Sequence, residues 1–240
     1  MSEWSTYTLS DFLLFSPRTY YRLFDLYNAA IWPLHVAALV LGLAIIVLAA
    51  RGGPAAQRVI AGALSLCWFW VAWAFLHQHY AAINWAADYV AIAFGVEAGL
   101  LLLLALRPRA WSRTSNFGPA AWVGIGLLIF AVILQPLLGP LLGRPWSQVQ
   151  MFGLAPDPTV VATLGVLLLG PARGHWTLMV IPVLWCLIGG ATLWAMGQPD
   201  AIILPAVAII GIATSSIGRR RHFDVSDPQE SDSKAGARTF

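Results

Sequence analysis

The sequence has few charged residues and very little cysteine. Only 10% of its 240 residues are charged, whereas a soluble domain has about a quarter. Hydrophobic residues make up 59% of the chain and are gathered in long runs. This composition excludes a soluble, disordered or fibrous protein and predicts an integral membrane protein. The two cysteines, Cys67 and Cys186, lie in apolar runs without CxxC spacing, so we expect small buried side chains rather than a disulfide or metal framework.

Signatures of several functional classes are also missing. The chain has no Walker loop, no GxSxG and no HExxH motif, so no catalytic residue is predicted and an enzyme is not favoured. The last apolar run has no lysine for a retinal Schiff base, and no basic cluster suited to nucleic acid lies in the folded part. The absence of an internal repeat argues against a transporter built from inverted repeats.

The apolar runs predict an all-α bundle of seven transmembrane helices. A spanning helix needs about 20 mostly apolar residues. The fifth run is short and bounded by prolines, so we expect a tilted, broken or re-entrant segment. A broken or re-entrant segment requires protein or water around it, because its free backbone groups need hydrogen-bond partners. The predicted spans are 29–50, 57–76, 86–106, 119–142, 159–171, 176–196 and 201–218.

Arginines predict the orientation, because basic loops favour the cytoplasmic side. Basic loops alternate with loops that carry few or no basic residues, which predicts an outer N-terminus and a cytoplasmic C-terminus in a bacterial inner membrane. The loop with His77 and the loop with Asp200 have no Lys or Arg, and Arg144 stands alone in its loop. The basic loops hold Arg51 and Arg58, then Arg107, Arg109 and Arg113, then Arg173, and finally Arg219–Arg221.

The two ends of the chain differ in kind from the bundle at 29–218. Residues 1–28 predict an interfacial amphipathic segment, since Ser16-Pro17 is a good helix start and Tyr20, Leu23, Phe24 and Tyr27 form one apolar stripe. This segment is either a lid over the outer mouth of the bundle or a passive lead into the first span. Residues 219–240 are polar and mixed in charge, which predicts a disordered cytoplasmic tail.

Several stretches resemble one protein family. They are TLSDFLLFSPRTYYRLFDLYNAAIWP at Thr8–Pro33, WVAWAF at Trp70–Phe75, YAAINWAAD at Tyr80–Asp88, FGLAPDPT at Phe152–Thr159 and LWCLIGGATLWAMG at Leu184–Gly197. The chain is similar here to a family of bacterial multi-pass membrane proteins of unknown function, whose members are sometimes labelled permeases. The resemblance implies a seven-span bacterial membrane protein. It assigns no role to any residue, because the family has no established activity.

Polar residues gather in the outer half of the predicted bundle. Asp157 and Asp200 lie at outer mouths, while the inner half is aliphatic and edged by arginines. This asymmetry predicts an outward-facing polar vestibule, and the alternative is the polar loop layer of any such bundle. The predicted vestibule residues are His35, His77, His79, Asn84, Asp88 and Gln135.

His77 and His79 are also candidate metal ligands, with Asp88 nearby and His35 at a similar depth. Residues at i and i+2 of a helix point about 200° apart, so the two histidines converge only if the segment is extended. A haem held between facing histidines is a further alternative. No cofactor is predicted from these residues, because hydrogen-bonded interfacial histidines are the favoured interpretation and no HExxH or CxxC signature supports a metal.

Glu97 is the one ionisable residue near the middle of a predicted span. A charge at this depth is costly, so Glu97 is a candidate proton-linked or gating group, or a neutral acid bonded to another helix. Gly95 and Gly99 form a GxxxG pattern for helix packing, and Glu97 points away from it.

These features predict a permease-like protein that handles a small solute or ion through the vestibule. Its expected partners are the lipid bilayer and a small solute or ion, with a homo-oligomer or a partner subunit as an alternative, and no nucleic acid. A scaffold in a membrane complex would explain the glycine pattern, and a metal or haem protein would explain the histidines.

Substitution of the predicted site tests this hypothesis. We expect Glu97→Gln or His79→Ala to abolish transport or ligand binding in protein that still folds, because each removes a group that titrates or binds. Unchanged activity in both variants contradicts the predicted site.

Overall fold

The computed structural model describes residues 15–107, 118–170 and 176–225, and these are helical with no strand among them. Residues 1–14, Arg109, Arg113, Arg173 and most of the predicted tail lie outside the described residues. The elements are α1 (Pro17–Ile31), α2 (Leu34–Arg51), α3 (Pro54–Trp70) with a π-helical turn η3 (Val71–His77), η4 (Tyr80–Ala82), α4 (Ala87–Leu106), α5 (Pro119–Ile129) with a π-helical turn η5 (Phe130–Leu134), α6 (Gln135–Leu141), η6 (Trp146–Gln148), α7 (Pro156–Leu168), α8 (Trp176–Ala195) and α9 (Ile203–Val225).

Each apolar run predicted as a span holds a helix, but the first begins later than predicted, because residues 29–31 still belong to α1 and α2 starts at Leu34. Within the described ranges, five helices are long and apolar enough to cross a membrane, whereas Pro156–Leu168 and Ile203–Ile217 are apolar but shorter. α9 continues to Val225, beyond the predicted boundary at residue 218. The five long helices are Leu34–Arg51, Pro54–Ala82, Ala87–Leu106, Pro119–Leu141 and Trp176–Ala195.

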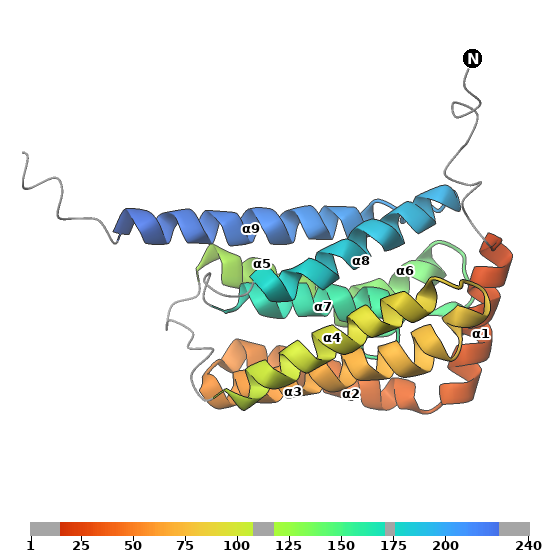
Figure 1. The fold of residues 1–240 in the computed structure, drawn as a ribbon, viewed down its shortest axis with the longest axis horizontal. Coiled ribbons are helices and arrows are strands. Elements are labelled where there is room, and N and C mark those ends of the chain that lie inside the picture. The colour runs from red at the N-terminus through yellow and green to blue at the C-terminus, as the bar shows by residue number, and fades with distance from the viewer. Residues whose placement is uncertain (1–14, 108–117, 171–175, 226–240) are drawn as a thin grey trace, which may run out of the picture.

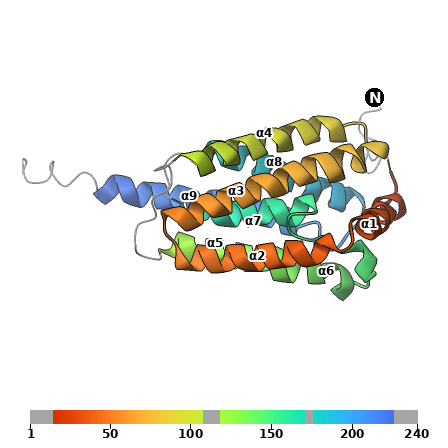
Figure 2. The same ribbon diagram turned by 90° about the horizontal axis from the view of Figure 1, so that it is seen from below.

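The long helices run side by side, and α1 lies across one end of them (Figures 1 and 2). We call this end, which also holds η4, α6 and the α8–α9 connection, the α1 end. Ser16 caps α1 by accepting a hydrogen bond from Thr19 N (3.2 Å), as its sequence predicts. The predicted stripe of Tyr20, Leu23, Phe24 and Tyr27 is the buried face of α1.

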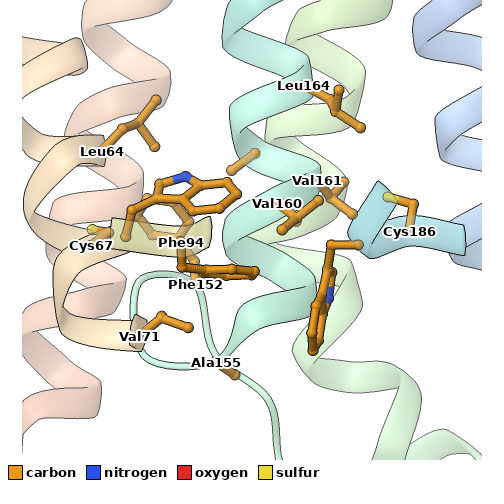
Figure 3. Packing of buried hydrophobic residues seen from close by; sticks show 14 of the residues in the cluster. Leu64, Cys67, Val71, Phe94, Phe152, Ala155, Val160, Val161, Leu164 and Cys186 are labelled. Atoms are coloured by element: carbon orange, nitrogen blue, oxygen red, sulfur yellow. The ribbon is translucent and has the colours of Figure 1, made fainter. Parts of the chain in front are cut away.

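α7 is the centre of the bundle, because every one of its 13 residues is buried. It packs against α3, α5, α8 and α9. Figure 3 shows Val160, Val161 and Leu164 of α7 between the side chains of neighbouring helices. Cys67 and Cys186 are both free and buried, which confirms that they act as small apolar side chains.

A buried stretch without helix precedes α7. Phe152–Ala155 is buried, so its backbone polar groups must find partners inside the protein. Tyr27 donates from its hydroxyl to Leu154 O (2.9 Å), and Gly153 N donates to Thr159 Oγ1 (2.9 Å). Thr159 Oγ1 in turn donates to Ala155 O (2.7 Å). The run predicted as the fifth span is therefore a short helix preceded by a buried turn, and Tyr27 of α1 and Thr159 hold this turn.

Glycines bring α7 and its neighbours close together. A Cβ atom on Gly124 of α5 would lie 2.5 Å from Gly165 O of α7, and one on Gly165 would lie 2.7 Å from Gly124 O. Gly190 of α8 likewise leaves no room for a Cβ beside Pro205 of α9. Such close backbone contact is how small residues stabilise membrane helix pairs.

The glycine contact gives a matched pair of substitutions. We expect Gly124→Ala to lower the Tm in detergent by at least roughly 3 °C, because overpacking costs about 1–3 kcal/mol. Gly126→Ala, two residues along the same helix, meets nothing within 4 Å and should leave the Tm almost unchanged. Equal Tm values for the two variants would show that the α5–α7 contact does not limit stability.

Candidate functional site

The predicted vestibule residues do not converge on one site. His77 Nδ1 lies 2.8 Å from Asp88 Oδ1, and both side chains are about half exposed at the α1 end. His79 Nδ1 instead lies 2.6 Å from Ala74 O. Asn84 Oδ1 accepts a hydrogen bond from Ala86 N (3.1 Å) and so shapes the turn before α4. Of these residues, the structure pairs only His77 with Asp88.

His35 lies in a different place. Its Nε2 is 3.2 Å from Asn28 Oδ1, and it lines a mostly apolar groove with Trp32, Leu39 and Met151. No group of three or more His, Cys, Asp or Glu side chains in the described ranges is arranged to hold a metal ion.

Glu97 is buried in α4 with 0% of its surface exposed. Neither carboxyl oxygen has a hydrogen-bond partner within the part of the chain that the structure describes. Gly95 and Gly99 point elsewhere, since no described atom lies within 4 Å of a Cβ placed on either residue. Glu97 is therefore separate from both the predicted vestibule and the glycine pattern.

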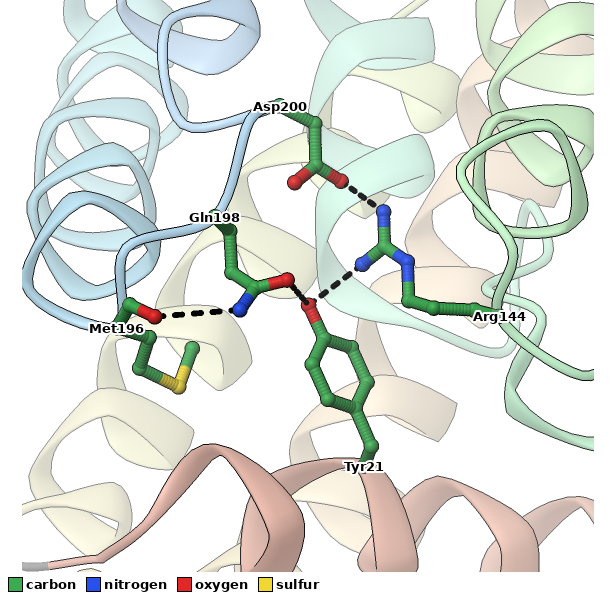
Figure 4. A network of polar contacts seen from close by, with 5 residues as sticks. All are labelled: Tyr21, Arg144, Met196, Gln198 and Asp200. Carbon is green, nitrogen blue, oxygen red and sulfur yellow. Dashed lines mark hydrogen bonds and ion pairs between the residues drawn. The ribbon is translucent and has the colours of Figure 1, made fainter.

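A polar network at the α1 end joins three distant parts of the chain (Figure 4). Arg144, after α6, forms an ion pair with Asp200 of the α8–α9 connection. Its Nη1 also donates to the hydroxyl of Tyr21 on α1 (2.5 Å). That hydroxyl donates to Gln198 Oε1 (2.9 Å). The network therefore joins α1 to the connection that follows α6 and to the connection between α8 and α9.

The charges of this network are fixed by its surroundings. Burial raises the pKa of Tyr21 to about 12, although Arg144 opposes the shift, so Tyr21 stays a neutral donor. Burial alone would lower the pKa of Arg144, but its bonds to Asp200 and Tyr21 outweigh this and raise the pKa above its ordinary value. Arg144 therefore remains a cation, which the pair with Asp200 requires.

The network borders a small cavity of about 40 Å³. Four of its lining residues carry a buried polar atom without a hydrogen-bond partner among the described residues. Buried polar groups are almost always satisfied, so these atoms indicate water or a ligand in the cavity. The four atoms are Gln135 Oε1, Arg144 Nε, Gln150 Oε1 and Asp200 Oδ1.

Asp157, at the start of α7, also lines this cavity and is only 5% exposed. Its Oδ1 accepts a hydrogen bond from Trp185 Nε1 (2.8 Å), and its carboxyl group is hydrogen-bonded to Gln150. Pro156 at the first turn and the buried break before it set the depth of this carboxyl group in the bundle.

A wider hollow of about 880 Å³ lies beside α1 and adjoins the cavity. Gln148 lines both spaces, and Tyr21 lines the hollow while bonding to Arg144 of the cavity. Of the predicted vestibule residues, His79 lines the hollow and Gln135 lines the cavity. The π-helical turn η5 directly precedes Gln135, and such turns often occur at functional sites.

Four residues of the network and the cavity are not predicted as site residues from the sequence: Tyr21, Arg144, Gln150 and Gln198. One signal could have identified Arg144, because it is a lone arginine in a loop predicted to lie outside. Asp200 lies in another loop predicted on the same side, which makes it a candidate partner for this arginine.

Removal of one hydroxyl group tests the network. We expect Tyr21→Phe to lower the Tm by several degrees, because it leaves Gln198 Oε1 without its donor at a cost of about 1–3 kcal/mol. Tyr89→Phe is the control, since Tyr89 is 68% exposed on α4. The network would not stabilise the fold if both variants melted like the unsubstituted protein in differential scanning fluorimetry.

Comparison with known proteins gives a family but no activity. Neither the search of curated proteins nor the search of solved structures gave a match to the chain. The family model described as "Family of unknown function (DUF6064)" matches residues 18–226, a range that contains the bundle, every residue of the cavity and all of α1 except its first residue. The chain therefore belongs to this family of unknown function.

Proposed function

We propose that the chain is a seven-span protein of the bacterial inner membrane with a permease-like role. A small solute or ion enters the hollow beside α1 from the outside and is held in the cavity lined by Arg144, Asp157 and Asp200. The observation that supports this most directly is the set of four buried, unpartnered polar atoms around one cavity. Gln148 lines both spaces and therefore stands between the point of entry and the binding site.

The lengths and surroundings of the elements support α7 and α9 as the two further spans. The 13 residues of α7 give a helix of roughly 20 Å. This is shorter than the hydrocarbon thickness of about 30 Å, and the buried turn at 152–155 before α7 makes the segment a broken span that is surrounded by protein. In α9, the apolar part Ile203–Ile217 is extended by residues up to Val225.

The placement of arginines supports the orientation. Arg51 and Arg107 lie at the end of the bundle opposite α1 (Figure 1). Because basic residues favour the cytoplasmic side, the α1 end faces outward in this proposal. Glu97 is buried in α4 away from the cavity, and we keep it as the candidate proton-linked or gating group on the cytoplasmic side of the cavity.

A thermal-shift screen tests solute binding without knowing the solute. Full-length protein in mild detergent is heated with a panel of inorganic salts and very small neutral solutes that a cavity of about 40 Å³ could hold. We expect at least one compound to raise the Tm of the unsubstituted protein by several degrees, since a ligand that binds only the folded state stabilises it. Gln135→Leu should lose this shift, because it removes a cavity-lining oxygen.

Gln57→Leu is the matched control. Gln57 is also a buried glutamine with an unpartnered Oε1 among the described residues, but it lies in α3 at the opposite end. Its substitution should leave every ligand-induced shift intact. The proposal is wrong if no compound shifts the unsubstituted protein, or if the shift is the same in Gln135→Leu.

A second candidate role is that of a subunit in a membrane complex. The exposed glycine face of α4 favours it, because no described atom lies within 4 Å of a Cβ on Gly95 or Gly99. Gentle crosslinking that recovers a stable partner through α4, lost in Gly99→Leu, would support this role over solute handling.

A further inference from the structure

The cavity at the α1 end carries one more negative than positive charge. Among the described residues that line it, Asp157 and Asp200 are acidic and Arg144 is basic. Arg144 is committed to Asp200, whereas Asp157 accepts its hydrogen bonds from neutral groups. Buried charges are normally paired, because an isolated ionised carboxylate loses its hydration without compensation. An ionised Asp157 therefore lacks a compensating positive charge at this site.

The unpartnered atoms indicate what kind of ligand would supply it. Three of the four are oxygens, from two amides and one carboxylate, and Arg144 Nε is the single donor. Amide and carboxylate oxygens bind hard cations and accept hydrogen bonds from ammonium groups. An anionic ligand would meet three acceptors and one donor, which disfavours it.

The size of the cavity limits the ligand further. A water molecule needs roughly 10–15 Å³ of such space, so about 40 Å³ holds roughly three water-sized particles. A bare ion or ammonium with one or two waters fits, and a quaternary or polyatomic organic cation does not. A divalent ion would overcompensate a site that lacks a single charge.

We propose that this cavity binds one small monovalent cation, held by Gln135 Oε1, Gln150 Oε1 and Asp200 Oδ1 and balanced by the carboxylate of Asp157. This inference rests on the proposed solute-handling role and names the class of its ligand. The cation completes the charge balance that Arg144 leaves open and supplies a partner to cavity-lining oxygens that have none among the described residues.

The test compares small and large cations at equal ionic strength. The Tm of full-length protein in mild detergent is measured in sodium, potassium, ammonium and choline chloride. A bound cation at about 100 times its Kd should raise the Tm by roughly 5–10 °C relative to choline. The comparison among sodium, potassium and ammonium identifies which cation the site prefers.

Two variants assign this shift to the cavity. Asp157→Asn keeps the shape of the side chain but removes the unpaired charge, so the apparent Kd should rise at least about tenfold. Gln135→Leu, which leaves both carboxylates in place, should also weaken the shift, and Gln57→Leu should retain it in full. Two independent variants keep the test informative if one of them fails to fold.

The possible outcomes separate the cation inference from the proposed function. Equal Tm values in all four salts overturn the inference, as does an unchanged cation effect in both cavity variants. If neutral solutes still shift the unsubstituted protein but not Gln135→Leu, solute handling stands and only the cation is wrong. A Tm that depends on pH but not on the salt shows that a proton balances Asp157, which also overturns the inference.

Discussion

The structure depends on satisfying a buried stretch of backbone that is not helical. Residues 152–155 enter the bundle where water is excluded, and each unpaired polar group there would cost several kcal/mol. Tyr27 reaches in from α1 to bond Leu154 O, and Trp70 Nε1 donates to the Tyr27 hydroxyl (3.0 Å). The Thr159 hydroxyl accepts a hydrogen bond from Gly153 N and donates one to Ala155 O. α1 is therefore part of the folded bundle, beyond the passive interfacial role that its sequence also allows.

The same break creates the polar chemistry at the α1 end. Because the chain returns into the bundle before α7 begins, Gln150 and Asp157 lie around one cavity with Arg144 and Asp200. Residues of α1 hold the returning segment from outside: Asn28 Nδ2 donates to Ser147 O (2.7 Å), and Ser147 and Gln148 donate to Asp25. If this segment were a continuous helix, Gln150 and Asp157 would be spread along the helix axis and would not both line the cavity.

The remainder of the bundle is held by apolar packing and close glycine contacts. α7 is enclosed on all sides, and Gly124 and Gly165 let it approach α5 at backbone distance. Trp68 is fully buried against this core and donates from Nε1 to Thr163 Oγ1 (2.8 Å). This rigid centre fixes the position of Asp157 at the start of α7, which is what a small and selective cavity requires.

The sequence by itself determined the helices and the burial of α1. Long apolar runs can only be helical in a membrane, and the Ser16 cap and the aromatic stripe specify α1, because both signals are local along the chain. Only the tertiary structure decided the site. The partners of Arg144 lie 123 and 56 residues away, and no local pattern records which loop ends meet. His35, His77 and Asn84 shared a predicted depth with Gln135 but found separate neighbours, because depth in a membrane does not specify which helices are adjacent.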